Sequence, residues 1–163
     1  MIFHASFDAR QPRHVAEVLA EIFGGGSVAP FPPIADDSWL AMAGDDRNTM
    51  IEVYPRGVVL MEADGDRDAM GQHDPNAASS AGSSTHLAIA SRLESGAVIA
   101  IAEREGWPVK YRKRGDLFGV LEIWIEGDRM LEVLTADMQA EYLATMTPAN
   151  WTQMIATHGG VAG

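Results

Sequence analysis

The sequence predicts an α+β fold: tandem β-α-β-β-β modules that form a curved, partly open mixed sheet around a cavity, followed by a C-terminal helical tail. The same order of strand and helix patterns occurs twice. Late in each half, a predicted strand that contains a tryptophan is followed by a turn with Gly, Asp and Arg. A strand with the pattern apolar-apolar-Glu-Val comes next. His4 and His86 lie 82 residues apart, and Glu52 and Glu132 lie 80 apart. A period of this size makes each half one supersecondary unit.

The first module is predicted over residues 1–63. Ile2 to Asp8 alternates apolar and polar side chains, which is typical of a half-buried strand. Pro12 to Phe23 has a proline at its start, apolar side chains at helical spacing and a glycine run after its end, so it predicts a helix. Further strands are predicted near Val28, at Ser38–Ala43 and at Thr49–Tyr54, with an edge strand at Val58–Ala63.

Residues 64–84 are rich in Asp, Gly, Ala and Ser and poor in apolar residues, so they predict a flexible linker. The second module, residues 85–135, then repeats the order of the first. Its helix is predicted at Glu94–Glu105, where Gly106 and Pro108 end it. Its strands are predicted at Thr85–Ser91, Val109–Lys113, Val120–Glu126 and Met130–Leu134.

Residues 136–163 predict a helical C-terminal tail. The first helix is expected at Ala136–Met146. A second helix begins after Thr147, which is a suitable N-cap, with Pro148 in its first turn. Its apolar edge would pack on the same chain or on a partner, and consists of Trp151, Met154 and Ile155.

Composition excludes several classes of function. Acidic residues outnumber Lys and Arg by 23 to 12, giving a formal charge of −11 that disfavours nucleic acid as a partner. No apolar run approaches the ~20 residues of a membrane span, and the N-terminus does not read as a signal peptide. With no cysteine in the chain, we expect a cytoplasmic protein. The basic cluster Lys110–Arg114 is interpreted as a solvated hairpin, with an anionic ligand as the alternative.

Two histidines and two glutamates form the candidate site. Singly, each has an ordinary structural explanation, as a strand histidine with a hydrogen-bond partner or a glutamate that faces water. Together, His4, Glu52, His86 and Glu132 all lie opposite apolar neighbours on their strands, and would project from the sheet face that the helix leaves open. A pseudo-twofold between the modules would bring them to one point in the cavity. Imidazole nitrogen and carboxylate oxygen suit Mn, Fe, Co, Ni or Zn.

This pattern resembles the vicinal oxygen chelate superfamily, the group of glyoxalases, bleomycin-resistance proteins and extradiol dioxygenases, from Met1 to about Thr135. In the family, metal ligands lie on the first and last strands of each module, and His4, Glu52, His86 and Glu132 match those positions. The G-D-R turn before M-L-E-V is similar to the usual family hairpin but lacks its proline and second glycine. His-Glu-His-Glu is similar to glyoxalase I, whereas extradiol dioxygenases typically use two His and one Glu.

The resemblance implies a glyoxalase-like protein that uses a divalent metal for proton transfer, a lyase or isomerase reaction, on a small oxygenated molecule. It implies Glu132 as the base and His4, Glu52 and His86 as metal ligands. The usual Phe-Tyr pair late in the first helix is replaced by Glu21 and Ile22, and no glutathione-binding set is recognisable, so the substrate stays open. The alternative is a non-catalytic protein of the bleomycin-resistance type that binds a drug or antibiotic. A third hypothesis is a structural relic, in which the four polar residues only hydrogen-bond to one another.

Other residues receive structural interpretations. Trp39 and Trp124 occupy similar places before the turns and are predicted to line the core or the cavity wall. Arg47 and Arg129 are interpreted as turn residues. His14, on the solvent side of its helix, is given no role, and neither are His73 and His158. We expect a homodimer, because each module leaves open sheet edges and a concave face; whether the cavity lies within one chain or between two stays open.

Overall fold

Two four-stranded mixed sheets form the framework of the computed structural model, which describes residues 2–62, 64–65, 68–78 and 83–158. The first sheet has the strand order β1-β4-β3-β2, with β1 parallel to β4 and the other pairs antiparallel. The first module consists of β1 (His4–Ala9), α1 (Pro12–Ile22), β2 (Ser27–Pro30), β3 (Trp39–Met42) and β4 (Met50–Pro55).

The second sheet repeats this topology, with the order β7-β10-β9-β8 and a parallel β7–β10 pair. The predicted fold class, with its two β-α-β-β-β units and helical tail, is therefore confirmed. The second module consists of β7 (Leu87–Ala90), α3 (Ser95–Arg104), β8 (Val109–Arg114), β9 (Phe118–Ile125) and β10 (Arg129–Leu134).

The segment between the modules differs from the prediction. Where a linker was expected, β6 (Met70–His73) pairs with β5 (Val58–Met61) in a separate two-stranded sheet, and α2 (Pro75–Ala78) follows. Thus β5 does not extend the first sheet. Gly71 lies so close to the carbonyl of Ile34 that a Cβ would overlap it, so the hairpin packs against the connection between β2 and β3. Residues 66–67 and 79–82 of the predicted linker lie outside the described residues.

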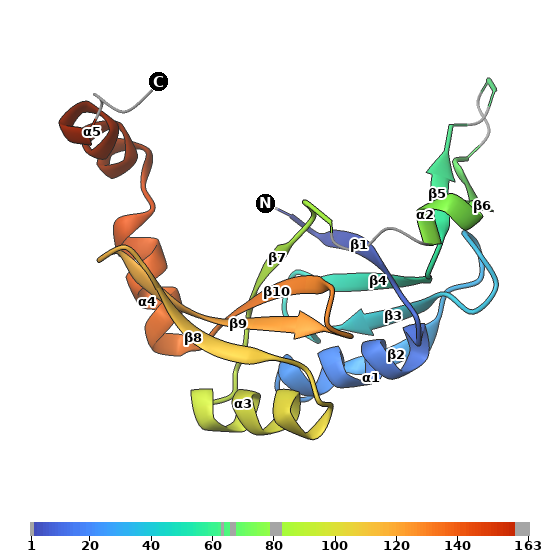
Figure 1. The fold of residues 1–163 in the computed structure, drawn as a ribbon, viewed down its shortest axis with the longest axis horizontal. Helices are drawn as coiled ribbons and strands as arrows, with labels where there is room; N and C mark the ends of the chain where they lie inside the picture. Colours follow the sequence, from blue (N-terminus) through green and yellow to red (C-terminus); the bar gives the residue numbers. More distant parts are fainter. Residues whose placement is uncertain (1, 63, 66–67, 79–82, 159–163) are drawn as a thin grey trace.

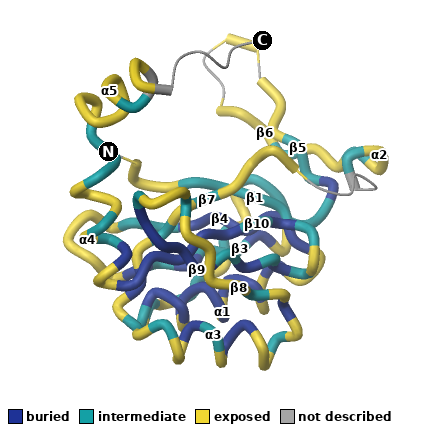
Figure 2. Tube along the Cα trace, turned by 60° about the vertical axis from the view of Figure 1, so that its left-hand side comes forward, coloured by how far each residue is buried: buried dark blue, intermediate teal, exposed yellow. Residues whose placement is uncertain are grey.

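Helices α1 and α3 cover one face of the two sheets and leave the other face open (Figure 1). Figure 2 shows buried residues concentrated where the helices meet the strands. Strand residues of one parity point to the helices and form a continuous core, because side chains alternate across a sheet. The principal core residues are Val15, Leu19, Ile22, Ile51 and Val53 in the first module and Val98, Ile101, Leu121, Ile123, Leu131 and Val133 in the second.

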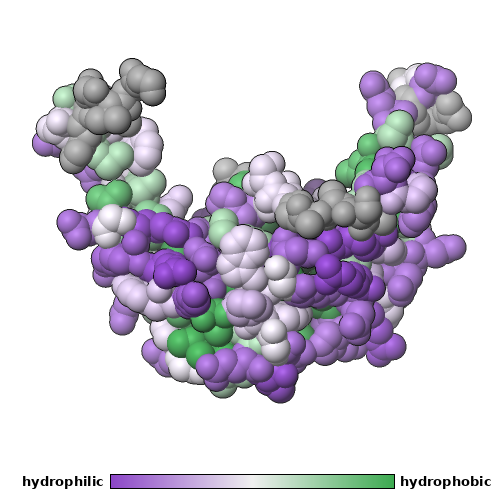
Figure 3. Space-filling model, in the orientation of Figure 1, coloured by the Kyte–Doolittle hydropathy of each residue, from purple (hydrophilic) through white to green (hydrophobic). Residues whose placement is uncertain are grey.

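Two projections flank the open face. The β5–β6 hairpin rises at one end and the helices α4 (Ala136–Thr145) and α5 (Pro148–His158) rise at the other, on the same side of the sheets (Figures 1 and 3). Helix α4 also covers the end of the second sheet, where Tyr142 makes an edge-to-face contact with Phe118. No helix among the described residues is long and apolar enough to cross a membrane.

An ion cluster joins the modules at the start of α1. Arg129 was expected to be a turn residue, but it begins β10 and its buried guanidinium donates to both carboxylate oxygens of Asp8, at 2.9 and 3.1 Å. The Glu126 carboxylate accepts from the backbone N–H of Arg10 and Gln11 at the N-terminus of α1, where a negative charge is stabilised. The other ion pairs join Arg10, Arg56 and Arg129 to Asp128, and Arg56 to Asp8 and Glu126.

Candidate functional site

The open face of the first module contains a histidine–glutamate pair. His4 begins β1 beside Met50, and Glu52 lies opposite Ser6 on β4. Because paired positions on parallel neighbours share a face, the imidazole and carboxylate meet there, with Nε2 4.0 Å from Oε1. Glu52 is only 9% exposed, whereas the His4 side chain is 59% exposed. The pair therefore combines a buried carboxylate oxygen with an accessible imidazole nitrogen.

Tyr54 holds the Glu52 carboxylate. Its hydroxyl donates a short hydrogen bond to Oε2, which leaves Oε1 facing His4. Burial raises the pKa of Tyr54, and the hydrogen bond to Glu52 and its negative charge raise it further, although Ser6 hydrogen-bonds to Tyr54 and acts in the opposite direction. Tyr54 thus remains a neutral donor. Sequence reasoning missed it, although its position two residues after Glu52 puts it on the same strand face.

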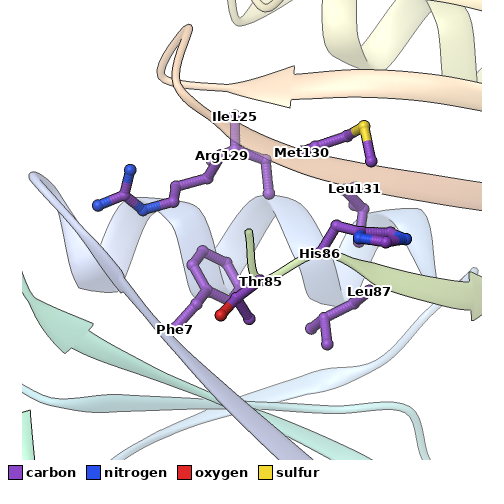
Figure 4. A pocket seen from close by; sticks show the side chains of 8 residues that line it. All are labelled: Phe7, Thr85, His86, Leu87, Ile125, Arg129, Met130 and Leu131. Carbon is purple, nitrogen blue, oxygen red and sulfur yellow. The ribbon is translucent and has the colours of Figure 1, made fainter. Parts of the chain in front are cut away.

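The second module contains the matching positions. His86 directly precedes Leu87, which pairs with Leu131, so His86 lies beside Met130 as His4 lies beside Met50. Figure 4 shows the His86 ring at the edge of β7 near Met130 and Leu131. Glu132 is buried on β10, opposite Ala88, in the register position that Glu52 has in the first module. Both predicted pairs therefore occupy equivalent places.

Glu132 also has a partner that the sequence did not predict. Arg114 contacts its Oε1 through Nη2 and through Nε at 3.0 Å, and donates to Glu122 Oε2 at 3.0 Å. The hydrogen bond to Glu132 is the main cause that raises the pKa of Arg114. Burial raises the pKa of Glu122, but hydrogen bonds from Trp124 and Arg114 outweigh it, so that pKa lies below its usual range. This half of the face is an ionised cluster.

The four predicted ligands do not meet within one chain. His4 and Glu52 lie in one sheet and Glu132 in the other. Among the residues that the structure describes, no group of three or more His, Asp or Glu side chains is close enough to hold a metal ion. A single chain therefore presents two separate groups of predicted ligands, called half-sites below, each with one imidazole and one carboxylate.

A pocket of about 420 Å³ lies between the first strands of the two modules. Both His4 and His86 line it, so each half-site borders this space. The remaining wall is mainly apolar and includes Phe3, Phe23, Met50, Leu87 and Ile89. The pocket can accept an apolar molecule and present two imidazoles to it.

The two tryptophans, which occupy similar places in the sequence, lie on opposite faces of their sheets. Trp39 pairs with Val53 of the buried core, and Arg13 of α1 lies over its ring at 5.1 Å. Trp124 pairs with Met130 on the open face, and its Nε1 donates to Glu122 at 3.1 Å. Only Trp124 is therefore in a position to contact a ligand on that face.

His14 has a contact that the sequence did not predict. Its Nε2 lies 2.6 Å from Oε2 of Glu105, which follows α3, so it joins the first helix to the second module. Burial raises the pKa of Glu105, but hydrogen bonds from Arg104 and His14 outweigh it and lower that pKa. His14 therefore has a structural contact on the helix side of the molecule.

Comparison with known proteins gives a likeness of fold. No family model matches the chain, and no curated protein matches it. A protein of Agrobacterium tumefaciens solved by NMR is 12% identical, with a TM-score of 0.51 over 82% of this chain and 94% of that chain. Lactoylglutathione lyase of the same organism is 14% identical, with a TM-score of 0.49 over 83% of this chain and 93% of that chain. A fosfomycin resistance protein of Mesorhizobium loti is 13% identical, with a TM-score of 0.46 over 82% of this chain and 89% of that chain. The first of these shares the fold of this chain.

Proposed function

We propose that this chain is a divalent-metal-dependent enzyme of the glyoxalase type that transfers a proton on a small oxygenated molecule. The metal ligands are His4, Glu52, His86 and Glu132. The observation that supports this most is the matching register of the two His–Glu pairs, which gives each module a nitrogen and an oxygen donor on its open face. The residue types also agree with the ligand pattern of the vicinal oxygen chelate superfamily.

Each half-site supplies two of the four proposed metal ligands. Imidazole and carboxylate donors suit Zn, Ni, Mn, Fe or Co, but two donors in one chain leave the coordination incomplete. We therefore propose a homodimer in which the first module of one copy faces the second module of its partner, so that four ligands meet. Such an isologous arrangement forms the site twice, once on each side of the twofold axis.

The protein residues have separate roles in this proposal. When bound, the cation stabilises negative charge that develops on a substrate oxygen. Arg114 contacts only Oε1 of Glu132, and among the described residues nothing hydrogen-bonds Oε2, so Oε2 is the atom that accepts the proton. Tyr54 fixes the orientation of Glu52, which remains a ligand. Trp124 and the cationic strand β8 border the Glu132 side of the site.

A second candidate is a non-catalytic protein that binds a small apolar molecule. The pocket between the modules favours it, because its volume of about 420 Å³ lies in the range of small-molecule sites and its wall is largely apolar. In this case His4 and His86 would orient a ligand in the pocket, and no metal would be required.

Metal analysis of protein purified without added metal, followed by melting in added Mn, Ni or Zn, tests the enzyme proposal. Wild type should contain metal, and added metal should raise its Tm, because a ligand that binds only the native state stabilises it. His86→Ala should lose most of this rise. His14→Ala is the control, and should keep the rise while its metal-free Tm falls slightly. A wild-type protein with neither metal nor a metal-dependent Tm would favour the binding protein.

A further inference from the structure

Strand β8 is the outer strand of the second sheet (Figure 1), and it has a row of cations on the open face. Arg114 reaches Glu132 on that face, and Arg112 and Lys110 lie two and four residues before it. Because side chains alternate along a strand, the three cations share one face. The sequence alone allows two interpretations of this cluster, a solvated hairpin or a contact with an anionic ligand.

Two of these cations have hydrogen-bond donors to offer a ligand. Lys110 is exposed opposite Glu122, and among the described residues no ion pair engages it. Arg112 is also exposed, and its Nε lies 4.0 Å from Glu122 Oε1, beyond hydrogen-bonding distance. Glu122 already accepts from Arg114 through Oε2 at 3.0 Å and from Trp124 through Oε1 at 3.1 Å. Its carboxylate is therefore held by other donors than Lys110 and Arg112.

This part of the open face has a surplus of positive charge. On strands β8, β9 and β10, the three cations of this face, Lys110, Arg112 and Arg114, stand against two carboxylates, Glu122 and Glu132. The chain as a whole has a formal charge of −11, so a long polyanion would be repelled by the surface beyond this patch. The patch therefore favours a small anion over a nucleic acid or an acidic protein.

The strand register puts Lys110 in line with the proposed base. Glu132 pairs with Glu122 on β9, and Glu122 pairs with Lys110 on β8. Neighbouring strands are ~4.8 Å apart, so the backbone of Lys110 lies about 10 Å across the sheet from that of Glu132. Trp124, two residues after Glu122 on the same face, lies beside this row. A ligand that extends from Glu132 to Lys110 would pass its indole ring, which is a suitable surface for an apolar segment.

We propose that Lys110 and Arg112 bind a carboxylate or phosphate group of the substrate. Arginine can grip such a group with two parallel hydrogen bonds, and lysine adds a compact positive charge. The substrate would then be a small molecule with its oxygens at Glu132 and the metal, an anionic group about 10 Å away, and Trp124 beside the segment between them. The metal end of this assignment rests on the proposed function, whereas the anion site requires no metal.

Titration of metal-free protein with inorganic phosphate and with acetate, in EDTA at constant ionic strength, tests the anion site alone. NMR amide signals of β8 and β9 should shift, and the tighter anion identifies the group. Lys110→Gln with Arg112→Gln should raise its Kd by about tenfold or more, because two charge-assisted contacts are lost. Arg13→Gln with Arg47→Gln removes the same charge from distant, exposed positions and should raise it less than about threefold. Equal effects of the two double variants, or no shift in wild type, would overturn the proposal.

Protein loaded with Zn or Ni then tests the span between the two ends. Among linear dicarboxylates of increasing length, affinity should be highest when the carboxylates can lie about 10 Å apart. Lys110→Gln with Arg112→Gln should abolish this optimum. Affinity that is independent of length, in protein that binds both metal and phosphate, would contradict the assigned substrate class. Protein that binds phosphate through Lys110 and Arg112 but binds no metal would support the anion site and count against the proposed function.

Discussion

Arg10 and Arg92, 82 residues apart, make the same contact in opposite directions. Arg10 donates to the carbonyl of Glu126 between β9 and β10, and Arg92 donates to the carbonyl of Ala43 between β3 and β4. An arginine of each module thus hydrogen-bonds to the last hairpin of the other module. These two contacts fix the modules relative to each other within a chain, so the proposed four-ligand site requires a second copy.

Replacing Arg129 should destabilise the whole chain. Its guanidinium side chain is 7% exposed and forms two hydrogen bonds with Asp8. Arg129→Ala removes two hydrogen bonds from that carboxylate, which keeps only the ion pair with Arg56, at a cost of about 3 kcal/mol in the free energy of unfolding. Urea unfolding measures the loss. Arg13→Ala, which removes an exposed pair with Glu17, should cost less than about 1 kcal/mol. Equal losses for the two variants would contradict the assigned importance of the cluster.

The cluster should also make the free energy of unfolding depend on pH in the acidic range. Burial raises the pKa of Asp128, but the hydrogen bond from Arg56 and nearby positive charges outweigh it, so the pKa lies below its ordinary value of 3.8. The unfolded chain therefore binds a proton at higher pH than the native chain does. The resulting stabilisation is complete well above pH 3.8 and is lost as the pH falls through the native pKa.

Asp128→Asn tests this dependence. The difference in unfolding free energy between wild type and variant should be largest near neutral pH and should shrink as the pH falls below about 4. Urea titrations at several pH values measure it. A difference that stays constant, or grows in acid, would show that Asp128 is not stabilised as a carboxylate.

Tyr54→Phe should weaken metal binding while the fold is kept. The change removes the hydroxyl that holds Glu52, and loss of such an orienting group typically lowers metal affinity by about tenfold. Titration calorimetry with Zn or Ni measures the change in Kd. Tyr142→Phe is the matched control, because no hydrogen bond of its hydroxyl is found among the described residues and its ring keeps the contact with Phe118. Equal metal affinity in both variants would show that Tyr54 does not contribute to metal binding.

Arg114→Gln should have opposite effects on stability and on metal binding. Without the guanidinium, Glu122 and Glu132 face each other across paired strands, so the metal-free protein should melt at a lower temperature. Added metal should then raise the Tm by more than in wild type, because Glu132 no longer has a competing cation. Arg112→Gln, which has no contact with Glu132, serves for comparison. A smaller rise in Arg114→Gln would indicate that Arg114 supports the metal instead of competing with it.

The sequence predicts the elements well because strand alternation and helical spacing are local signals. The pair of His4 and Glu52 on strands β1 and β4 could be found in this way, since residue parity alone puts both side chains on one face. Glu132 was placed correctly on its strand, but its contact with Arg114 depends on how β8 and β10 are arranged across the sheet. No local pattern contains that information.

The features that the sequence did not predict have similar physical causes. Trp39 precedes Glu52 by 13 residues and Trp124 precedes Glu132 by 8, so the connecting turns differ by an odd number and reverse the face. Strand β6 lacks an apolar alternation, and only its pairing with β5 defines it. The contact between Arg129 and Asp8 spans 121 residues. These features are set by tertiary structure.

Metal content in mixtures of two inactive variants tests the shared site most directly. His4→Ala and His86→Ala should each lose most bound metal, because every site in either homodimer lacks one imidazole. In a dimer that contains one copy of each, one site lacks both histidines and the other has both. Random pairing should therefore restore about one quarter of the wild-type metal per chain. No recovery above the separate variants would contradict a site built from His4 of one copy and His86 of the other.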